Sequence, residues 1–498
     1  MRTFQKVMTF LLSFIVLLVS YGVSFIRTDE PEVFAIPAMT AAQWNGTNLY
    51  VNGKTTLIKV EEGEPLIQAL YPTFAFSDEL IIKIGDTSSK AFNYYGLSLQ
   101  SSKPLKGKIT YGILGTSYTE EFFIEQSDEP LDFFSFIDGY FKKHKGSNIS
   151  KLSFENLGGG QAELVINGVA FYNRKVLKDT VFVSGSDYKI GVSLKWGGSF
   201  SYLECLNTNV QAVRTNDKVI VGVDSLEKYG GKLITNEVNL INRNDTGRVI
   251  QQSYYGTVGE NDDYELGEFM GNQWGYNPVQ GGNQFNDASK IVDVKIGANS
   301  IYIKCRPLDW AKPADCITPS YMEATYTLVN SFVKVDCRFM DYSGWQSIVR
   351  GQELPAFYAV EPLNSFRYYG GDAPWMNDST IKREDALIFW PDAGYPYFTA
   401  TEYWCAWTNT EADGFGVGLY VPGINDMLAG VHDRGGIIGD DPSTSGPTTY
   451  VAAVKSLAIK SFKPLEYSYL VAAGKVSGIR QTFVQNKDVI DNSAMLAY

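Results

Sequence analysis

Hydrophobic and polar residues alternate in short runs along most of this chain. Runs such as residues 107–113 and 151–157 carry apolar side chains at about every second position, which is the period of a β-strand with one buried face. Turn residues separate the runs at short, fairly regular intervals, a spacing typical of β-sandwiches. No long amphipathic helix occurs, and residues 131–140 are the one stretch that suggests a short helix or an apolar crossing. The pattern predicts an all-β protein.

The runs fall into two groups, with a weakly patterned stretch at residues 174–187 between them. The first group lies within residues 36–178 and predicts an N-terminal β-sandwich. The second lies within residues 179–498 and predicts a larger antiparallel assembly of two sheets packed face to face. A chain of 498 residues is also too long for one ordinary core, so two domains are expected.

The N-terminus has the features of a secretion signal, predicted over residues 1–35. Arg2 and Lys6 precede an uncharged stretch at residues 7–26, and Val33 and Ala35 are small enough for a cleavage site after residue 35. The alternative is an uncleaved membrane anchor, because the uncharged stretch is about as long as a membrane-spanning helix. In both cases the rest of the chain is expected to be extracellular or at the cell surface.

Composition narrows the possible ligands. A net charge of -12 argues against nucleic acid as a partner, since phosphate binding needs a basic surface. With only two histidines, a multi-histidine metal centre is excluded, and no nucleotide-binding motif occurs, so neither a metal nor another cofactor is expected. Of the five cysteines, Cys305 and Cys316 flank a short loop and could form a disulfide. The oligomeric state is left open.

Residues 242–284 concentrate large planar hydrogen-bonding side chains in one glycine-rich segment that also carries a run of carboxylates, residues 260–268. Aromatic faces stack on the C–H face of a pyranose, while amides, guanidinium groups and carboxylates bind its hydroxyls. The alternative is that these are buried strand residues and satisfied turn residues. The segment predicts a carbohydrate ligand. The substrate-binding candidates are Arg248, Gln251, Gln252, Tyr255, Trp274, Asn277, Gln280 and, further along the chain, Trp310.

Sugar-processing enzymes commonly use two carboxyl groups, one as an acid and the other as a base or nucleophile. Glu353, in the strand-like run RGQELPAFY, and Asp309, beside Trp310, are the predicted catalytic pair. The alternative for each is a solvated or salt-bridged carboxylate without a catalytic role. Weaker candidates are Glu265, Glu268, Glu323 and Asp341.

Two blocks of sequence resemble the opening of a galactose-mutarotase-like supersandwich: YKIGVSLKWGGSFSYL at residues 188–203 and NLINRNDTGR at residues 239–248. The blocks GRVIQQSYYG, YNPVQGG, CRPLDWA and QELPAFY are similar to secreted bacterial proteins of unassigned function, which pair a carbohydrate-binding-module-like sandwich with such a supersandwich. The resemblance implies these folds for residues 36–178 and 179–498, and a sugar as the ligand. A mutarotase's catalytic histidine has no clear counterpart here, so the resemblance does not extend to that activity.

Three functions are therefore to be compared. The first is a secreted glycoside hydrolase that acts on an extracellular polysaccharide or oligosaccharide through a carboxylate pair. The second is a non-catalytic carbohydrate-binding or cell-surface protein. The third is a polysaccharide lyase, with Tyr254 or Tyr255 as the base and Arg248 neutralising a uronate; His432 is a further acid or base candidate. Two carboxyl groups in one cleft would favour an enzyme, and a flat aromatic strip would favour binding alone.

Overall fold

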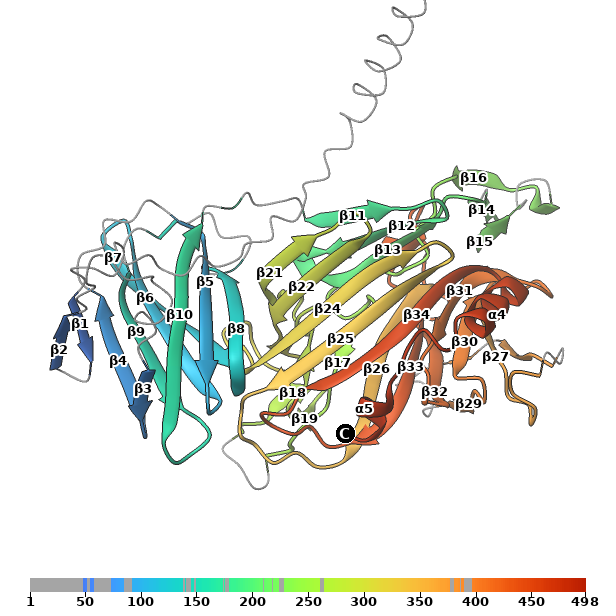
Figure 1. The fold of residues 1–498 in the computed structure, drawn as a ribbon. Helices are drawn as coiled ribbons and strands as arrows, with labels where there is room; N and C mark the ends of the chain where they lie inside the picture. The colour runs from blue at the N-terminus through green and yellow to red at the C-terminus, as the bar shows by residue number, and fades with distance from the viewer. Residues whose placement is uncertain are drawn as a thin grey trace, which may run out of the picture.

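A computed structural model gives the fold of this protein (Figure 1). Within the described residues the chain is nearly all β and forms several large antiparallel sheets, so the predicted fold class is confirmed. The predicted leader at residues 1–35 lies outside the described residues, as do residues 175–178 at the predicted domain boundary. The structure describes residues 48–51, 54–57, 73–84, 92–137, 139, 145–146, 149–172, 174, 179–208, 210–216, 218–223, 228–259, 264–376, 380–385, 387–388 and 396–498.

The N-terminal part is a sandwich of two antiparallel sheets (Figure 1). Phe122 and Phe133, one from each sheet, stack with ring centroids 5.2 Å apart in the shared core. The first sheet has the order β2 (Lys54–Leu57), β1 (Asn48–Val51), β4 (Glu79–Ile84), β9 (Ile149–Asn156), β6 (Leu105–Ile113), β7 (Thr116–Ile124). The second has the order β3 (Thr73–Phe76), β10 (Ala162–Tyr172), β5 (Tyr94–Ser101), β8 (Ser127–Phe136).

The stretch at residues 131–140, which suggested a helix, instead contributes its first half to strand β8, paired with β5. Both faces of β8 are covered. Phe133 packs inside the sandwich, whereas Phe134 and Phe136 pack into the core of the C-terminal part. A strand buried on both faces loses the alternation of apolar and polar residues, which is why its sequence did not look like a strand.

Two large sheets face each other in the C-terminal part, and its main core lies between them (Figure 1). The seven-stranded sheet has the order β23 (Leu308–Asp309), β20 (Pro278–Val279), β17 (Gln251–Ser253), β26 (Arg350–Val360), β33 (Thr448–Leu457), β32 (Asp426–His432), β29 (Tyr397–Thr399). The nine-stranded sheet has the order β21 (Lys290–Ile296), β22 (Ser300–Arg306), β24 (Ser320–Val329), β25 (Phe332–Asp341), β34 (Leu465–Lys475), β31 (Phe415–Tyr420), β30 (Trp404–Thr408), β27 (Ser365–Tyr368), β28 (Lys382–Asp385).

Smaller elements complete the C-terminal part. The α-helix α4 (Val476–Gln485), which the sequence pattern did not predict, buries Ile479 and Phe483, and its Arg480 forms an ion pair of 2.6 Å with the fully buried Glu402. The other elements are β11 (Thr180–Ser184), β12 (Tyr188–Ser193) and β13 (Ser199–Cys205); β14 (Val210–Thr215), β15 (Lys218–Val223) and β16 (Lys232–Thr235); the hairpin β18 (Gly267–Phe269) and β19 (Asn272–Trp274); the 3-10 helices η1 (Leu194–Trp196) and η2 (Pro442–Thr444); and α5 (Ser493–Leu496).

Two further features bear on the sequence predictions. Cys305 and Cys316 are both free, so the disulfide suggested by their spacing is not formed. None of the helices in the described part of the chain is long and apolar enough to cross a membrane.

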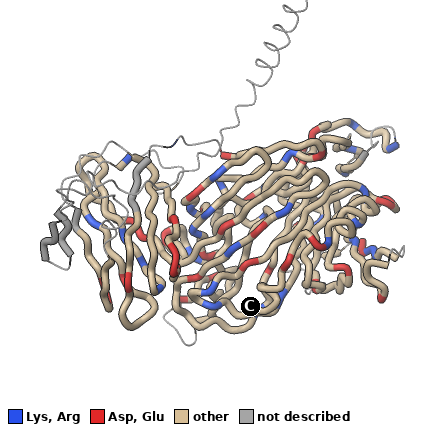
Figure 2. The backbone as a smooth tube through the Cα atoms, in the orientation of Figure 1, with Lys and Arg blue, Asp and Glu red and all other residues tan. Residues whose placement is uncertain are grey.

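Charged side chains join the N-terminal sandwich to the nine-stranded sheet. Arg338 on β25 pairs with Glu125 at 2.6 Å, and Lys290 on β21 pairs with Glu120 at 2.7 Å. Figure 2 marks the acidic and basic positions along this junction. The contacts are partly buried, so removing one partner would leave the other charge unpaired at the junction.

Candidate functional site

A cleft of about 700 Å³ lies on the outer face of the seven-stranded sheet. The inner face of that sheet is recognised by its contacts with the nine-stranded sheet: the Gln252 Nε2 donates to the Glu323 backbone oxygen at 2.9 Å, and the Tyr254 ring packs 4.4 Å from the Phe339 ring. Side chains of β17, β26, β32 and β33 form the cleft floor, and the loops and the β18–β19 hairpin form its walls. The floor is therefore held by the sheet, while the loops shape the opening.

Strand alternation decides which residues around β17 reach the cleft. Gln251, Ser253 and Tyr255 line it, and the intervening Gln252 and Tyr254 point to the core between the sheets. This is the two-residue period of a strand, in which neighbouring side chains point to opposite faces. Of the two adjacent glutamines predicted to bind substrate, only Gln251 lies on the outer face, and its amide is already bound to backbone groups.

The same rule separates neighbours on β20 and β23. Asn277 and Val279 line the cleft, whereas the Gln280 Nε2 donates to the Gly198 backbone oxygen at 3.1 Å and the Tyr326 hydroxyl at 3.2 Å. On the adjoining strand Trp310 lines the cleft. Gln280 thus supports the interior on the far side of the sheet.

Asp309 also lies behind the cleft wall. It is 2% exposed, and its Oδ2 accepts hydrogen bonds from the Tyr264 hydroxyl at 2.6 Å and from the Asn277 backbone N–H at 3.3 Å. Burial raises the pKa of this carboxyl, and these hydrogen bonds partly offset the rise. Asp309 positions the chain that carries Asn277 and Trp310, and it does not line the cleft.

The structure therefore brings most of the predicted site residues together. The weaker carboxylate candidates do not line the cleft: Glu323 and Asp341 are hydrogen-bonded within the nine-stranded sheet and its surroundings, and Glu265 and Glu268 lie outside the lining. The predicted residues that line the cleft are Arg248, Gln251, Tyr255, Trp274, Asn277, Trp310 and Glu353, and those that do not are Gln252, Gln280 and Asp309.

Glu353 reaches the cleft through an irregularity in β26. Its strand partner on β33 is Val454, and the next paired residue is Ala356, opposite Ala452, so the register shifts across Leu354 and Pro355. A bulge of this kind changes which face the following side chains occupy. As a result Glu353, Ala356 and Tyr358 all lie on the cleft floor, although strict alternation would separate them.

Hydroxyl groups surround the Glu353 carboxyl. Its Oε1 accepts hydrogen bonds from Tyr450 at 2.6 Å and from Tyr255 at 3.0 Å, and Ser253 is a third hydroxyl partner. Burial raises the pKa of Glu353, and the three hydroxyls offset only part of that rise. Arg350, which the sequence placed close to it, stacks instead on the Tyr255 ring at 5.6 Å. Glu353 is thus a partly buried carboxyl held in place by neutral donors.

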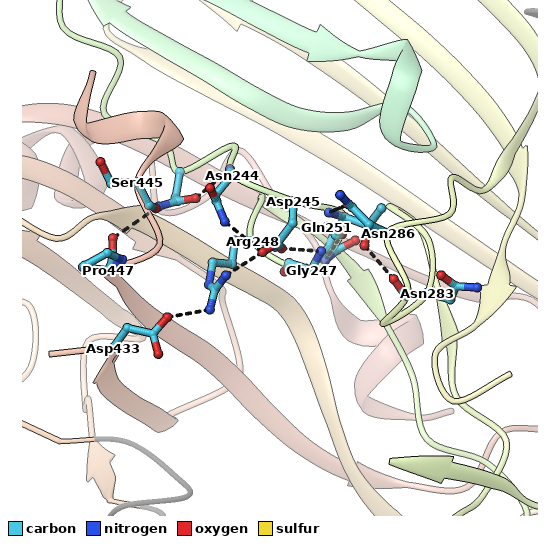
Figure 3. Close-up of polar contacts among 12 residues, drawn as sticks. Asn244, Asp245, Gly247, Arg248, Gln251, Asn283, Asn286, Asp433, Ser445 and Pro447 are labelled. Carbon is cyan, nitrogen blue, oxygen red and sulfur yellow. Dashed lines mark hydrogen bonds and ion pairs between the residues drawn. The ribbon is translucent and has the colours of Figure 1, made fainter. Parts of the chain in front are cut away.

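Arg248 joins two carboxylates that also line the cleft (Figure 3). Its Nη1 contacts Asp245 Oδ2 at 2.5 Å, and its Nη2 contacts Asp433 Oδ2 at 2.8 Å. The other oxygen of Asp245 accepts the backbone N–H groups of Gly247 and Arg248, which closes a tight turn. Gln251 anchors this turn by donating to the Thr246 and Gly247 backbone oxygens. The turn presents Arg248 and Asp245 to the cleft in a fixed arrangement.

His432, at the end of β32, also lines the cleft. Its ring stacks on Tyr358 with centroids 6.1 Å apart, and the Tyr450 ring meets it edge-on at 6.0 Å. Burial, reinforced by the positive charge of Arg248, lowers the pKa of His432 to about 4. The imidazole is therefore neutral near pH 7. No group of three or more His, Cys, Asp or Glu side chains able to hold a metal occurs in the described part of the chain.

Aromatic rings form another part of the cleft lining. Phe269 and Met270 belong to the β18–β19 turn, and the Phe269 ring lies edge-on to Trp274 at 5.2 Å and to Trp310 at 5.7 Å. The Trp274 Nε1 donates to the Asn277 Oδ1 at 3.1 Å, which fixes the orientation of the indole. These rings are only partly buried, so their remaining surface faces the cleft.

Several lining residues were not identified as site residues from the sequence. Asp245 stood inside the NRNDTGR block without being singled out, and His432 was proposed only as a further acid or base. A proline inside a strand often marks a bulge, so Pro355 could have indicated that Tyr358 shares a face with Glu353. Asp433 and Tyr450 carry no local signal, because the sheet brings them to the cleft from 185 residues after Arg248 and 97 residues after Glu353, respectively.

Comparisons with known proteins reveal distant likenesses only. No protein-family model matches this chain, and no curated protein matches it. It is similar over 60% of its length to a candidate aldose 1-epimerase from Escherichia coli K12, of which 99% is covered at 9% identity, with a TM-score of 0.30. A GH36 α-galactosidase from Geobacillus stearothermophilus matches 61% of this chain, with 41% of its own length covered, 11% identity and a TM-score of 0.32. A family 29 carbohydrate-binding module matches 26% of this chain and 85% of its own, at 12% identity and a TM-score of 0.15. TM-scores this low carry no inference about function.

Proposed function

We propose that this protein binds a carbohydrate in the cleft on the outer face of the seven-stranded sheet and hydrolyses a glycosidic bond there, with Glu353 as the proton donor. The observation that carries the proposal is the partly buried Glu353 carboxyl on the floor of a cleft lined by aromatic rings and amides. The predicted leader, residues 1–35, supports an extracellular place of action.

The size and lining of the cleft support a sugar ligand. A volume of about 700 Å³ falls within the range of small-molecule sites. Trp274, Trp310 and Tyr358 offer ring faces or edges for the apolar side of a pyranose. The amides that can bind its hydroxyls come from two loops and are Asn244, Gln284 and Asn286.

The surroundings of Glu353 suit a general acid. A carboxyl with a raised pKa keeps its proton to higher pH, which is the state that an acid catalyst needs. Because Tyr255 and Tyr450 both donate to Oε1, the proton of the acid form resides on Oε2. Glu353 would give this proton to the glycosidic oxygen as the bond from the sugar carbon to that oxygen breaks, and the bonding electron pair would stay on the oxygen.

Asp245 is the second carboxyl group in this proposal. It lines the same cleft, and the Arg248 guanidinium and two backbone N–H groups hold it in position. It would take a proton from the attacking water or attack the sugar carbon itself. The anomeric form of the first product distinguishes the two, because a nucleophilic carboxylate gives retention and a base gives inversion.

The same contacts argue against the lyase hypothesis. Arg248 would have to neutralise a uronate, yet both ends of its guanidinium already contact Asp245 and Asp433. Tyr255 would have to lose a proton, yet burial and the neighbouring Glu353 carboxylate raise its pKa well above the usual value. A phenol with a raised pKa is a poor base catalyst at neutral pH.

A non-catalytic carbohydrate-binding protein is the second candidate function. Its specific support is that Arg248 engages both of the other cleft carboxylates, Asp245 and Asp433. If these pairs persist when sugar is bound, Glu353 has no second carboxyl to work with, and the cleft would only bind.

One substitution separates the two functions. Purified protein is first screened for binding and product formation against a panel of polysaccharides. On the active glycan, Glu353→Gln is expected to lower turnover by roughly 10²–10⁴-fold while sugar affinity stays nearly the same, because an amide keeps the shape but cannot donate the acid proton. Glu361→Gln is the matched control, since burial also raises the pKa of Glu361, which lies outside the cleft lining. Binding without turnover by the unaltered protein would favour the second function.

A further inference from the structure

The cleft is lined by more negatively charged than positively charged side chains. Among its lining residues, Arg248 is the one side chain that is positively charged at neutral pH, and it faces two carboxylates, Asp245 and Asp433. The cluster of these three therefore carries one net negative charge before Glu353 is counted. His432 adds no positive charge near pH 7, because its pKa is lowered to about 4.

From this arrangement we infer that the cleft selects glycans whose sugar residues are uncharged and rejects those that carry uronate or sulfate groups, with the Asp245–Arg248–Asp433 cluster as the determinant of that choice. The inference rests on the proposed function, since it names the substrate class of the same site.

An uncharged sugar fits the hydrogen-bonding groups that the cluster leaves available. Sugar hydroxyls donate well to carboxylates, and Asp433, at 56% side-chain exposure, has its Oδ1 outside the contact with Arg248. Asn244 and Asn286 stand beside the cluster and can both donate and accept (Figure 3). Neighbouring hydroxyls of one sugar ring can therefore be bound without any change in charge.

An anionic sugar meets two obstacles. The two guanidinium ends that would bind its carboxylate or sulfate are already paired, so Arg248 must release Asp245 or Asp433 first. The released carboxylate would then stand unpaired beside a ligand of the same sign. Like charges brought together in a partly enclosed site repel one another, and such contacts are a common means of rejecting the wrong ligand.

The pair with Asp433 is the easier one to remove. Asp433 is 56% exposed and makes one contact with Arg248, whereas Asp245 also accepts two backbone N–H groups of its own turn. Asp433→Asn keeps the size of the side chain, takes away one negative charge and weakens its contact with the guanidinium Nη2. Asp440→Asn is the matched control, because Asp440 lies on the same loop and pairs with Arg214 at 3.2 Å, but does not line the cleft.

The test compares matched glycans by titration at low and high salt: a neutral oligosaccharide from the panel and the same oligosaccharide oxidised to the carboxylate at C6. The unaltered protein is expected to bind the neutral form at least tenfold more tightly at low salt. Asp433→Asn is expected to lower the ratio of the affinity for the neutral form to the affinity for the oxidised form by roughly tenfold. Asp440→Asn is expected to leave this ratio unchanged. Melting curves confirm that both variants are folded.

Three results would contradict the inference in distinguishable ways. Equal or tighter binding of the oxidised glycan by the unaltered protein overturns the inference and leaves the proposed function standing. An equal narrowing of the ratio in both variants assigns the selectivity to overall charge and overturns the role of the cluster. Failure of every neutral and oxidised pair to bind overturns the proposed function itself.

Discussion

The two faces of the seven-stranded sheet carry similar side chains with different surroundings. On the inner face, Gln252, Gln280 and Asp309 have their polar atoms bound by backbone groups and tyrosines of the protein. On the outer face, their immediate neighbours Gln251 and Trp310 border an open cleft. The polar side chains of the inner face complete the fold. On the outer face, Trp310 keeps ring surface open to the cleft, whereas the Gln251 amide borders the cleft but is bound by backbone groups.

This difference shows what composition alone can indicate. The density of aromatic and amide side chains in residues 242–284 predicted a polar site, and the cleft does lie there. Density does not distinguish the two faces of a strand, because a buried amide with all its partners and an amide facing a ligand have the same sequence signature. Alternation distinguishes them once one residue of the strand has been assigned to a face.

Removing an inner-face amide should have the largest effect and tests whether that face serves the fold alone. Gln280→Ala is expected to lower the free energy of unfolding by about 2–4 kcal/mol, because it leaves buried groups without partners and opens a cavity. The groups affected are the Gly197 backbone oxygen and the Gln252 backbone N–H, while the Gly198 oxygen keeps its hydrogen bond from the Tyr326 hydroxyl. Denaturant unfolding gives the loss, and titration should show unchanged glycan affinity per folded molecule. Lost affinity with unchanged stability would place Gln280 in the site after all.

An outer-face aromatic residue should give the opposite result. Trp274→Ala is expected to weaken glycan binding by roughly tenfold, about 1.4 kcal/mol, because a partly exposed indole loses its contact with the sugar. Its effect on unfolding should be small, since the hairpin it belongs to lies at the surface. Tyr397→Ala is the control, because Tyr397 is an exposed aromatic residue at the edge of the seven-stranded sheet and outside the cleft lining. Equal affinity of the two variants would remove Trp274 from the site.

The smallest expected effect is a change in the pH dependence of stability. Burial is the main reason that the pKa of Glu353 is raised in the folded state. The contribution of Glu353 to the free energy of unfolding is therefore fully present below the unfolded-state pKa and is lost as pH rises through the folded-state pKa. Replacing Glu353 with Gln should therefore make the protein relatively more stable as pH rises above about 4.5.

Glu402 provides the contrast for that measurement. Burial alone would raise its pKa, but hydrogen bonds from Arg480 and Trp404 lower it overall. The contribution of Glu402 to the free energy of unfolding is present above the unfolded-state pKa and is lost as pH falls through the folded-state pKa. Glu402→Gln should thus destabilise most near neutral pH and least in acid. Unfolding curves recorded between pH 3 and pH 8 would show slopes of opposite sign for the two variants, and slopes of the same sign would contradict both assignments.

The fold could be predicted from the sequence because alternation is a local signal. It is lost where both faces are covered, as in β8, or where a bulge changes the register, as in β26 between Glu353 and Ala356. Helix α4 was missed because it is only ten residues long and buries one narrow face on the strands.

The candidate site could be predicted only in part, because half of its floor comes from distant strands. The local density of polar and aromatic residues found Arg248, Tyr255 and Trp274. It could not find Asp433 or Tyr450, which reach the cleft because β33 pairs with β26 and β32 pairs with β33. Which carboxylates pair with Arg248 is likewise decided by the tertiary fold. A contact between residues 248 and 433 leaves no trace in the sequence on either side.

The most direct test of the central claim is a crystal structure of Glu353→Gln with the preferred neutral glycan from the panel. We expect a sugar ring in contact with Trp274 or Trp310, and the side chain of residue 353 within hydrogen-bond distance of the glycosidic oxygen. We also expect Arg248 to remain paired with Asp433. A glycan bound elsewhere on the protein, with nothing in the cleft, would contradict the account.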